Sequence, residues 1–417
     1  MSSIYRSENR IVFEGEFTIS DLHRPLAAIH QTVQNAGYQE VKFDFSECTV
    51  ALPAPMLALC AQVSRLQFAQ IETHLILPNI EKLKRLFINS NWANIISPKQ
   101  FETSNFRGHT QVPATQYRTT DEQFKAVNRI ANAILGAIPD LERNDFAALE
   151  WSINELTDNV LVHSQSPVGG FVQVSTFQSK TKRLLFMIAD AGIGIPASLS
   201  EGHNDISSDA DALDKAIREG VTRDKAIGQG NGLFGSYQIC SGSKGKFQLE
   251  SGYGKLSYSE RTGLRINTEK VPYEGTLVIA EIDFSVPHLL EEALRFDGKK
   301  YSPLDHIEKY YEHPIENSII FKVSEETSSF GSRVAGTPLR KKLLNLAKMC
   351  PNYPVIIDFS DVALISSSFA DELIAKLFVE VGAISFMSRF KFNGISSTVK
   401  SLIDRAISQR VAVGSID

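Results

Sequence analysis

A carboxylate and a carboxamide one helical turn apart are the first side chains in this chain that could do chemistry. They are Glu155 and Asn159, in the segment ELTDN at 155–159. On a helix, residues four apart lie on the same side, so their oxygen atoms would point the same way. Such oxygens suit a hard cation such as Mg²⁺ and a water molecule that a base activates. Taken alone, the pair fits a solvated helix face better, because Glu and Asn are mostly exposed.

A glycine-rich turn follows an apolar run later in the chain. The run covers 184–188 and the turn, DAGIGI, covers 190–195. The run predicts a buried strand with Asp190 at its C-terminal end. Gly192 and Gly194 would let a flat ligand approach the backbone, and Asp190 would accept a hydrogen bond from an amino group such as that of adenine. For this motif alone, an ordinary turn after a strand is the better explanation.

A second glycine-rich turn, GQGNGL, occupies 228–233, directly before a helix-like segment at 233–240. Gly230 and Gly232 would present backbone N–H groups to an anion, aided by the dipole of the helix that follows. Glycines before a helix are also common for purely structural reasons, so this motif is weak by itself.

The elements that must hold these motifs can be read from the apolar pattern. Leu149, Ile153, Leu156 and Val160 recur at helical spacing, which predicts a packed amphipathic helix carrying Glu155 and Asn159. A helix is predicted at 121–137, and a strand at 277–282 follows the dipeptide Gly-Thr at 275–276. The four motifs therefore sit at the ends of regular elements.

In this order the motifs resemble the ATP-binding domain of the GHKL superfamily, which includes gyrase, histidine kinases and anti-sigma-factor kinases. The segment 155–164 resembles its N box, 190–195 its G1 box, 228–235 its G2 box, and 275–276 its final Gly-Thr. The resemblance covers about residues 121–285. It implies a Bergerat-type α/β sandwich that binds ATP with Mg²⁺.

The resemblance also implies a role for each matching residue. Glu155 would be the general base, and Asn159 would be the Mg²⁺ ligand. Asp190 would accept a hydrogen bond from the adenine amino group, with Thr276 close to the base. The remaining ATP-binding positions, which border the base and ribose or hold the phosphates, would be Gly192, Gly194, Gly228, Gly230, Asn231, Gly232 and Leu233.

The segment 196–227 would be a lid that closes over the nucleotide. Its Arg223 and Lys225 could reach the phosphates, although solvated surface charge is the favoured role for both. His163 falls where many members of the superfamily also have histidine, and we interpret it first as a structural histidine.

The composition excludes some classes of function. The chain has 417 residues, 43% of them hydrophobic and 22% charged, with a formal net charge of −5. This fits a multidomain protein and gives no sign of nucleic-acid binding. The 4 cysteines are far apart and fit reduced thiols. Because no signal peptide or membrane-length apolar run is present, we expect a cytoplasmic protein without a membrane partner.

Both ends of the chain have an α/β pattern. We expect an α/β domain at 1–105, a linker at 106–120, the ATP-binding domain at 121–285, a helical connector at 286–313 and a second α/β domain at 314–417. The predicted strands that matter here lie at 11–17, 40–45 and 73–77 in the first domain, and at 319–323, 355–359 and 390–393 in the last. The fold class expected for the whole chain is α/β.

The two end domains resemble each other. The segment VKFDFS at 41–46 corresponds to VIIDFS at 355–360, and in both a helix begins about ten residues later. The C-terminal copy is similar to STAS domains, the fold of anti-sigma-factor antagonists, in which a serine at that helix N-terminus is phosphorylated. Ser367 aligns best with that serine.

This chain departs from the STAS pattern near Ser367. The usual acid and glycine are replaced by Ser366 and Phe369, and the following Asp371 and Glu372 would disfavour a phosphate. Simple N-capping by the serines is therefore the favoured role. The N-terminal copy has Pro-Ala at 53–54 in place of serines, so it would be a scaffold.

Several functions follow from these resemblances. We expect an ATP- and Mg²⁺-binding regulatory protein that hydrolyses ATP and couples its nucleotide state to protein partners through STAS-like domains. The alternatives are an anti-sigma-type serine kinase acting on its own Ser367 or on another protein, and a nucleotide-gated binding module without catalysis. A homodimer is expected by family analogy only. The segment DLHRPLAAI at 21–29 faintly resembles the phosphoacceptor helix of histidine kinases, but the α/β pattern argues against a role of His23 as phosphoacceptor.

Overall fold

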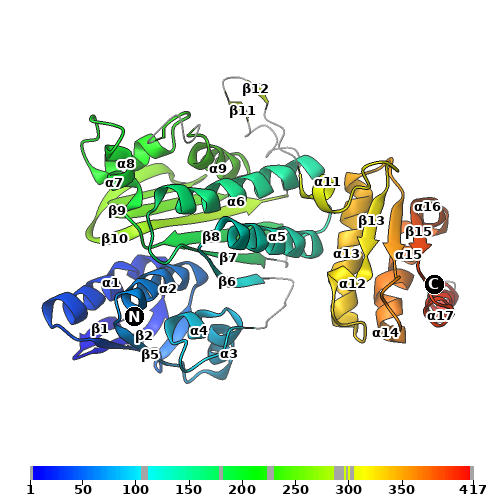
Figure 1. The fold of residues 1–417 in the computed structure, drawn as a ribbon, viewed down its shortest axis with the longest axis horizontal. Coiled ribbons are helices and arrows are strands. Elements are labelled where there is room, and N and C mark those ends of the chain that lie inside the picture. The colour runs from blue at the N-terminus through cyan, green and yellow to red at the C-terminus, as the bar shows by residue number, and fades with distance from the viewer. Residues whose placement is uncertain are drawn as a thin grey trace. The chain divides into compact units, whose positions relative to one another are not determined.

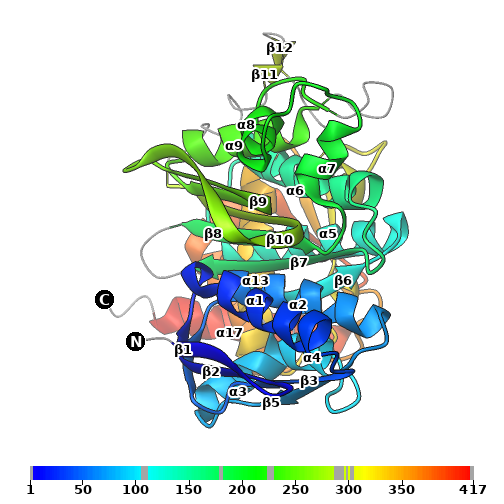
Figure 2. The same cartoon turned by 90° about the vertical axis from the view of Figure 1, so that its left-hand side faces the viewer.

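The computed structural model describes residues 3–104, 111–177, 182–222, 230–285, 295–296, 299–300 and 305–413. The chain forms two compact units with a mixed α/β fold (Figures 1 and 2). The first unit consists of 1–130, 151–177 and 183–301, and the second of 131–150, 178–182 and 302–417.

A five-stranded antiparallel sheet is the centre of the first unit. Its order is β6-β7-β8-β10-β9. The strands are β6 (Gln111–Tyr117), β7 (Gly170–Phe177), β8 (Arg183–Asp190), β9 (Lys246–Ser259) and β10 (Gly263–Asp283). β8 is thus flanked on both sides and buried, as its continuous apolar run predicts.

Helices cover one face of this central sheet. They are α5 (Thr120–Ala137), α6 (Arg143–His163), α7 (Gly194–Ser200), α8 (Asp209–Ala216) and α9 (Gly232–Gly242). Figure 2 shows α6 to α9 on this face. The predicted apolar stripe of α6 is buried, since Leu149, Ile153, Leu156 and Val160 are each at most 7% exposed. That burial leaves the other side of α6 for Glu155 and Asn159.

The N-terminal part of the first unit, residues 3–104, packs on the opposite face of the central sheet (Figure 2). Its own sheet has the order β1-β2-β3-β5, with β4 paired to β2. Its elements are β1 (Ser3–Ser7), β2 (Arg10–Phe17), η1 (Ile19–Asp21), α1 (His23–His30), η2 (Gln31–Asn35), β3 (Glu40–Asp44), β4 (Cys48–Ala51), α2 (Pro53–Phe68), β5 (Glu72–Ile76), α3 (Glu81–Asn89) and α4 (Trp92–Ile96).

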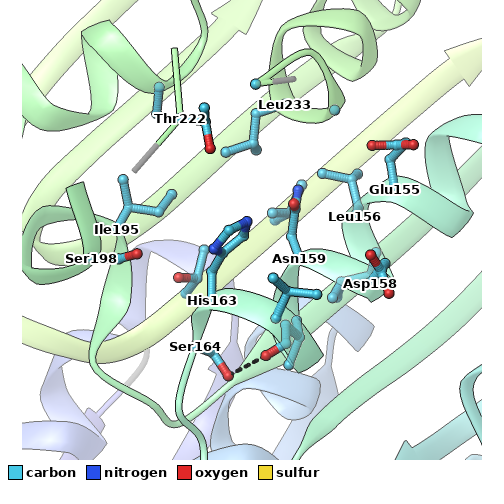
Figure 3. Close-up of a pocket in the computed structure, with 18 of the residues that line it drawn as sticks. Glu155, Leu156, Asp158, Asn159, His163, Ser164, Ile195, Ser198, Thr222 and Leu233 are labelled. Carbon is cyan, nitrogen blue, oxygen red and sulfur yellow. Dashed lines mark hydrogen bonds between the residues drawn. The ribbon is translucent and has the colours of Figure 1, made fainter. Parts of the chain in front are cut away.

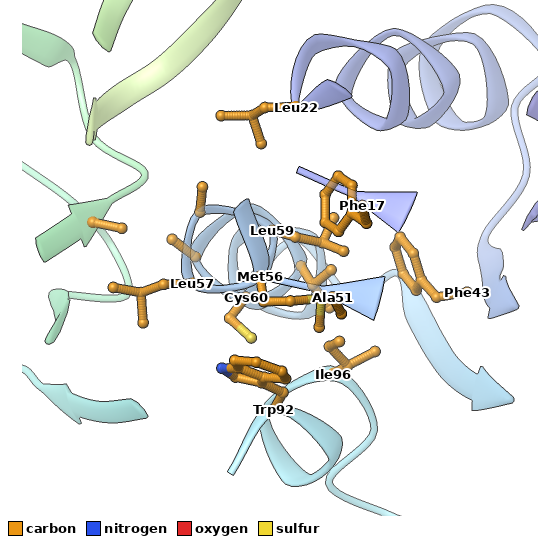
Figure 4. Close-up of a cluster of buried hydrophobic side chains, with 14 of the residues drawn as sticks. Phe17, Leu22, Phe43, Ala51, Met56, Leu57, Leu59, Cys60, Trp92 and Ile96 are labelled. Atoms are coloured by element: carbon orange, nitrogen blue, oxygen red, sulfur yellow. The ribbon is translucent and has the colours of Figure 1, made fainter. Parts of the chain in front are cut away.

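Helix α2 lies between the two sheets. Every residue from Ala54 to Ser64 is buried, so the helix is covered on all sides. Figure 4 shows Leu57 directed towards the central sheet, while Met56 and Leu59 point into the N-terminal part. One hydrophobic cluster therefore runs through both sheets. It includes Phe43 of β3 as well as Met187 of β8.

The predicted linker at 106–120 is wrong in its described portion. Residues 111–117 form β6, an edge strand that pairs with β7, and α5 begins at Thr120. An edge strand tolerates the proline at 113, because only one of its sides needs ladder hydrogen bonds. In the predicted connector at 286–313, the described residues form the short strands β11 (Arg295–Phe296) and β12 (Lys299–Lys300) and the helix α11 (His306–Tyr310).

The second unit contains a three-stranded parallel sheet of order β13-β14-β15. Its strands are β13 (Ile319–Lys322), β14 (Val355–Asp358) and β15 (Phe390–Asn393). Its helices besides α11 are α12 (Val323–Glu326), α13 (Arg333–Met349), α14 (Ser367–Ala370), η3 (Asp371–Ala375), α15 (Lys376–Val381), α16 (Ala383–Arg389) and α17 (Ser397–Val413).

The two ends of the chain share a strand order and a turn. In both, three parallel strands lie side by side in the order of the sequence, β2-β3-β5 at one end and β13-β14-β15 at the other, although the short strand β4 lies between β3 and β5 in the chain. After the middle strand, the N–H of Ser46 donates to the carboxylate of Asp44 at 2.9 Å, and that of Ser360 donates to Asp358 at 2.8 Å. The same short motif therefore makes the same local turn twice.

Candidate functional site

A cavity of about 390 Å³ opens between α6, the turn after β8, the N-terminus of α9 and the part of β10 around Thr276 (Figure 3). This volume is within the range typical of sites for small molecules. The structure brings to it nearly all the residues that the sequence nominated. These are Glu155, Asn159, Asp190, Gly194, Gly230, Asn231, Gly232, Leu233 and Thr276.

Asp190 is the acid at the end of β8, and it is only 2% exposed. Burial raises the pKa of its carboxyl to about 7, although hydrogen bonds from Gly192 and Thr276 act in the opposite direction. The N–H of Gly192 donates to Oδ1 at 2.8 Å. A buried acceptor of this kind gains most from a further donor supplied by a ligand.

The turn after β8 is packed too closely for side chains. A Cβ on Gly192 would lie 1.9 Å from the carbonyl oxygen of Ser164, and the next residue, Ile193, donates its N–H to the same oxygen at 2.8 Å. Gly194 has φ +77°, in the left-handed region that favours glycine. Gly192 therefore does not line the cavity itself but joins the turn to the end of α6.

Glu155 and Asn159 face the first residue of α9, as expected for side chains on one side of a helix. A Cβ on Gly232 would lie 3.1 Å from Oε2 of Glu155 and 3.2 Å from Nδ2 of Asn159. Burial, and to a smaller extent the charge of Asp158, raises the pKa of Glu155. A carboxylate with a raised pKa is a stronger base, which suits proton abstraction.

The second glycine-rich turn reaches the cavity through its last residues. Gly230 has φ +72°, and a Cβ there would lie 2.5 Å from the backbone of Val221. Oδ1 of Asn231 accepts a hydrogen bond from the N–H of Gly220 at 3.2 Å, so the Asn231 side chain holds the turn rather than pointing at a ligand. Gly228, Arg223 and Lys225 lie outside the described residues.

Four further polar residues line the cavity (Figure 3). Asp158, Ser198 and Thr222 were not predicted from the sequence, and His163 was interpreted as a structural histidine. Asp158 adds a second carboxylate beside Glu155, and the other three add polar groups. His163 points into the cavity in the close-up, beside Asn159. The charge of Asp158 could have been noticed in the sequence. Ser198 and Thr222 lie in a segment that contains no recognisable motif. Only the folded structure shows that they line the cavity.

The serines of the second unit lie at the start of a helix. Ser366 is the N-cap residue of α14, and its hydroxyl accepts the N–H of Phe369 at 3.0 Å. Ser367 is the first helical residue and its side chain is exposed. The capping role therefore belongs to Ser366, which leaves the hydroxyl of Ser367 accessible.

Comparison with known families gives one match, and it falls on this segment. Residues 335–400 match a family described as a STAS-like domain of unknown function (DUF4325). The second unit contains a STAS-like domain. No curated protein matches the chain. Within the described residues, no helix is long and apolar enough to cross a membrane.

In the STAS-like domain, the two acids after the serines are both paired. Arg410 contacts Asp371 through two hydrogen bonds of 2.6 and 2.8 Å. Glu372 accepts a hydrogen bond from Thr337 at 3.0 Å and lies beside Lys376. These partners outweigh burial, so the pKa values of both carboxyls are lowered. The repulsion that the sequence predicted for a phosphate near Ser367 is therefore partly compensated by basic side chains.

The described part of the chain has no group of three or more His, Cys, Asp or Glu side chains arranged to hold a metal ion by themselves. Asn159 and Glu155 can supply oxygen ligands, but a cation there would need further ligands from water or from phosphate oxygens. Mg²⁺ bound together with a nucleotide has this kind of coordination, because it keeps several waters and uses few protein ligands.

Proposed function

We propose that the first unit is a GHKL-type ATPase domain that binds ATP with Mg²⁺ in the cavity. The observation that carries the proposal is the position of Asp190, a buried acid in the lining of a cavity that Glu155 and Asn159 also line. The carboxylate of Asp190 would accept a hydrogen bond from the amino group of adenine. This group supplies the donor that a buried carboxylate needs. The fixed glycine turns leave room for a flat ring beside it.

Another part of the cavity lining suits the phosphates. Helix α9 begins there at Gly232, and the dipole of the helix favours an anion at its N-terminus. Asn159 would hold Mg²⁺ through its carboxamide oxygen, and the ion would supply positive charge next to the phosphates. Glu155 takes the proton of the attacking water as the bond between the γ-phosphorus and the bridging oxygen breaks and ADP leaves.

The STAS-like domain would allow ATP hydrolysis to regulate the binding of a protein partner. Such domains commonly mediate protein interactions. We propose that the nucleotide state of the first unit controls how this domain, and the N-terminal part as a second STAS-like copy, bind a protein partner. The shared strand order and the shared Asp-Phe-Ser turn support the assignment of the N-terminal copy.

A protein-serine kinase is the second candidate. Its support is the exposed hydroxyl of Ser367 at the N-terminus of α14, where a phosphate would be stabilised by the helix dipole. In this version Glu155 takes the proton from a serine hydroxyl instead of from water.

The experiment follows the terminal phosphate of γ-labelled ATP with Mg²⁺ and the full-length protein. Release as free phosphate, abolished by Glu155→Gln while ATP still binds, supports the ATPase. Label retained on the protein and lost in Ser367→Ala supports the kinase. ATP binding without transfer to either acceptor supports the nucleotide-gated module.

Asp121→Asn is the matched control, because it removes an exposed carboxylate that does not line the cavity and whose partner is Lys125. Its label release should equal that of the unaltered protein. If ATP does not bind, or if Asp190→Asn binds it with unchanged affinity at neutral pH, the assignment of the cavity is wrong.

A further inference from the structure

One polar side chain of the N-terminal part contacts β10 close to Asp190 from the far side of the central sheet. It is Gln62, which is 8% exposed and lies in the middle of the buried helix α2. A buried amide in a helix surrounded by apolar side chains needs partners, because an unpaired polar group is unfavourable there. Its partners are therefore informative.

The partner of Gln62 belongs to the irregular part of β10 next to Thr276. Nε2 donates to the carbonyl oxygen of Glu274 at 2.6 Å. The same amide is close enough to the hydroxyl of Tyr273 to lower the pKa of that phenol, against the larger effect of burial, which raises it. The hydroxyl of Tyr273, fully buried, in turn donates to the carbonyl oxygen of Asp190 at 3.1 Å.

The backbone at this place is irregular and depends on such support. The pairing of β10 with β9 shifts register on both sides of Tyr273, and Gly275 has φ +111°. A Cβ on Gly275 would lie 2.3 Å from the carbonyl oxygen of Asp190, so the two backbones are in close contact. A bulge lacks regular ladder hydrogen bonds, and here the carbonyl of Glu274 finds its donor in Gln62.

A second contact of the N-terminal part with the central sheet involves the neighbouring strand, β9. His23 of α1 lies 3.0 Å from the buried carboxylate of Glu250, which also contacts Lys255 at 3.0 Å. The next residue, Ser251, donates its hydroxyl to the carbonyl oxygen of Gly275 at 2.6 Å and accepts the N–H of Ile195 at 2.9 Å. The N-terminal part therefore contacts both strands at this place, β10 through Gln62 and β9 through His23.

We infer that Gln62 is a positioning residue for the base-binding end of the cavity, so that the N-terminal part, through α2, sets the affinity for the nucleotide. The inference rests on the proposed function and adds a regulatory role to it. Gln62 holds the carbonyl of Glu274 and the hydroxyl of Tyr273 in place, and these groups hold Thr276 and Asp190 in the correct position relative to each other. A protein partner that displaces α2 would remove this support and weaken nucleotide binding without touching the cavity.

The test is Gln62→Met, which keeps the length of the side chain but removes both donors. We expect the affinities for ATP and for ADP to fall by the same factor, roughly tenfold, as for the loss of one buried hydrogen bond. The dependence of ATP binding on Mg²⁺ should not change, because the phosphate end is untouched. Titration calorimetry measures affinity and stoichiometry together, so a fraction of unfolded protein would appear as lowered stoichiometry instead.

Two further variants separate positioning from general damage. Gln67→Ala removes an amide of the same helix that bonds only within the N-terminal part, to Thr73, Ile95 and Ile96, and should leave both affinities unchanged. Tyr273→Phe removes only one hydroxyl and should weaken binding as Gln62→Met does. The double variant should lose less than the sum of the two, because both act through one chain of hydrogen bonds.

Unchanged affinities in Gln62→Met and Tyr273→Phe would overturn the inference while leaving the proposed function intact. An equal loss in Gln67→Ala would also overturn it, because the effect would then follow the stability of the N-terminal part. If the unaltered protein does not bind ATP, both proposals fail together. If it binds ATP but Asp190→Asn binds it with unchanged affinity, the assignment of the cavity is wrong and the inference about Gln62 fails with it.

Discussion

Gly232 lies directly against Glu155: a Cβ at this first residue of α9 would approach both Cβ and Oε2 of the carboxylate side chain to 3.1 Å. This distance is tighter than ordinary van der Waals contact. The helix that would bind phosphate and the helix that would supply the base are therefore in direct contact at this point beside the cavity. A second close contact between these helices joins the hydroxyls of Ser152 and Ser236 at 2.7 Å.

Gly232→Ala should therefore disturb the chemistry more than the fold. The added methyl group displaces the carboxylate of Glu155, and we expect ATP hydrolysis to fall about tenfold or more for a displacement of this kind. The free energy of unfolding should change by about 1 kcal/mol or less, because alanine is the better helix former. Steady-state phosphate release and thermal unfolding measure the two effects.

Gly331→Ala is the control for this substitution, since nothing lies within 4 Å of a Cβ at that glycine. It should leave hydrolysis and stability as they are. Full hydrolysis by Gly232→Ala would show that the contact between α9 and Glu155 has no catalytic importance.

The serines of the STAS-like domain should behave differently from each other. Ser366→Ala removes the N-cap of α14 and should destabilise the protein by about 1 kcal/mol. Ser367→Ala removes an exposed hydroxyl and should leave the melting temperature unchanged. Thermal denaturation of both variants tests this. A loss of stability in Ser367→Ala equal to that in Ser366→Ala would contradict the assignment of the cap.

A buried lysine should matter more to the second unit than any surface charge. Nζ of Lys342, in a residue 5% exposed, contacts Oδ1 of Asn132 at 3.0 Å and the hydroxyl of Tyr311 at 3.3 Å, and it pairs with Glu326. Lys342→Met leaves the carboxylate of Glu326 without its cation, and we expect a loss of about 3–5 kcal/mol.

Lys342→Met combined with Glu326→Gln should recover part of that loss, because the uncompensated charge is then removed. The comparison is made by denaturant unfolding. Lys322→Met, which breaks an exposed pair with Glu325, is the control and should change the stability by less than about 1 kcal/mol. A single variant of Lys342 as stable as this control would argue against a buried ion pair.

Short-range sequence patterns predicted most of the helices and strands, because the burial pattern that forms each of them is set by residues close together in the chain. Helical spacing of apolar residues predicted α6, and a continuous apolar run ending in an acid predicted β8 and the place of Asp190. β6 was missed because its sequence, QVPATQY, is polar and interrupted by proline, which only an edge strand allows. The pairing of β6 with β7 depends on the tertiary structure, which the local sequence does not reveal.

The support of the site could not be predicted for the same reason. Gln62 and Glu274 are 212 residues apart, and no periodicity connects them. The sequence shows that α2 is apolar on all sides, which predicts burial, but it does not show what covers the helix. The role of the N-terminal part as more than a scaffold therefore appears only in the packing of α2 on the central sheet.

Nucleotide binding should depend on the protonation of Asp190. Burial raises the pKa of this carboxyl to about 7, and only the ionised form is a full acceptor for an amino group. The affinity for ADP should therefore rise with pH up to about 7 and be constant above it, with about a tenfold fall one pH unit below the pKa. Asp190→Asn should bind more weakly at pH 8 and lose this dependence. An identical pH profile in the variant would assign the titration to another group.

The same carboxyl should make the protein without nucleotide less stable as the pH rises. Its pKa in the folded state, about 7, is above the value of 3.8 for an unperturbed aspartate, so the unfolded chain releases its proton first. The contribution to stability is then complete below about pH 4, declines between pH 4 and 7, and stays low above pH 7. Asp190→Asn removes this decline, since its amide does not ionise. Relative to the unaltered protein, the variant should gain up to about 4 kcal/mol between pH 4 and pH 8, the energy that corresponds to a pKa difference of this size. Denaturant unfolding at the two pH values measures this gain, and a constant difference between the two proteins would show that the carboxyl of Asp190 titrates normally.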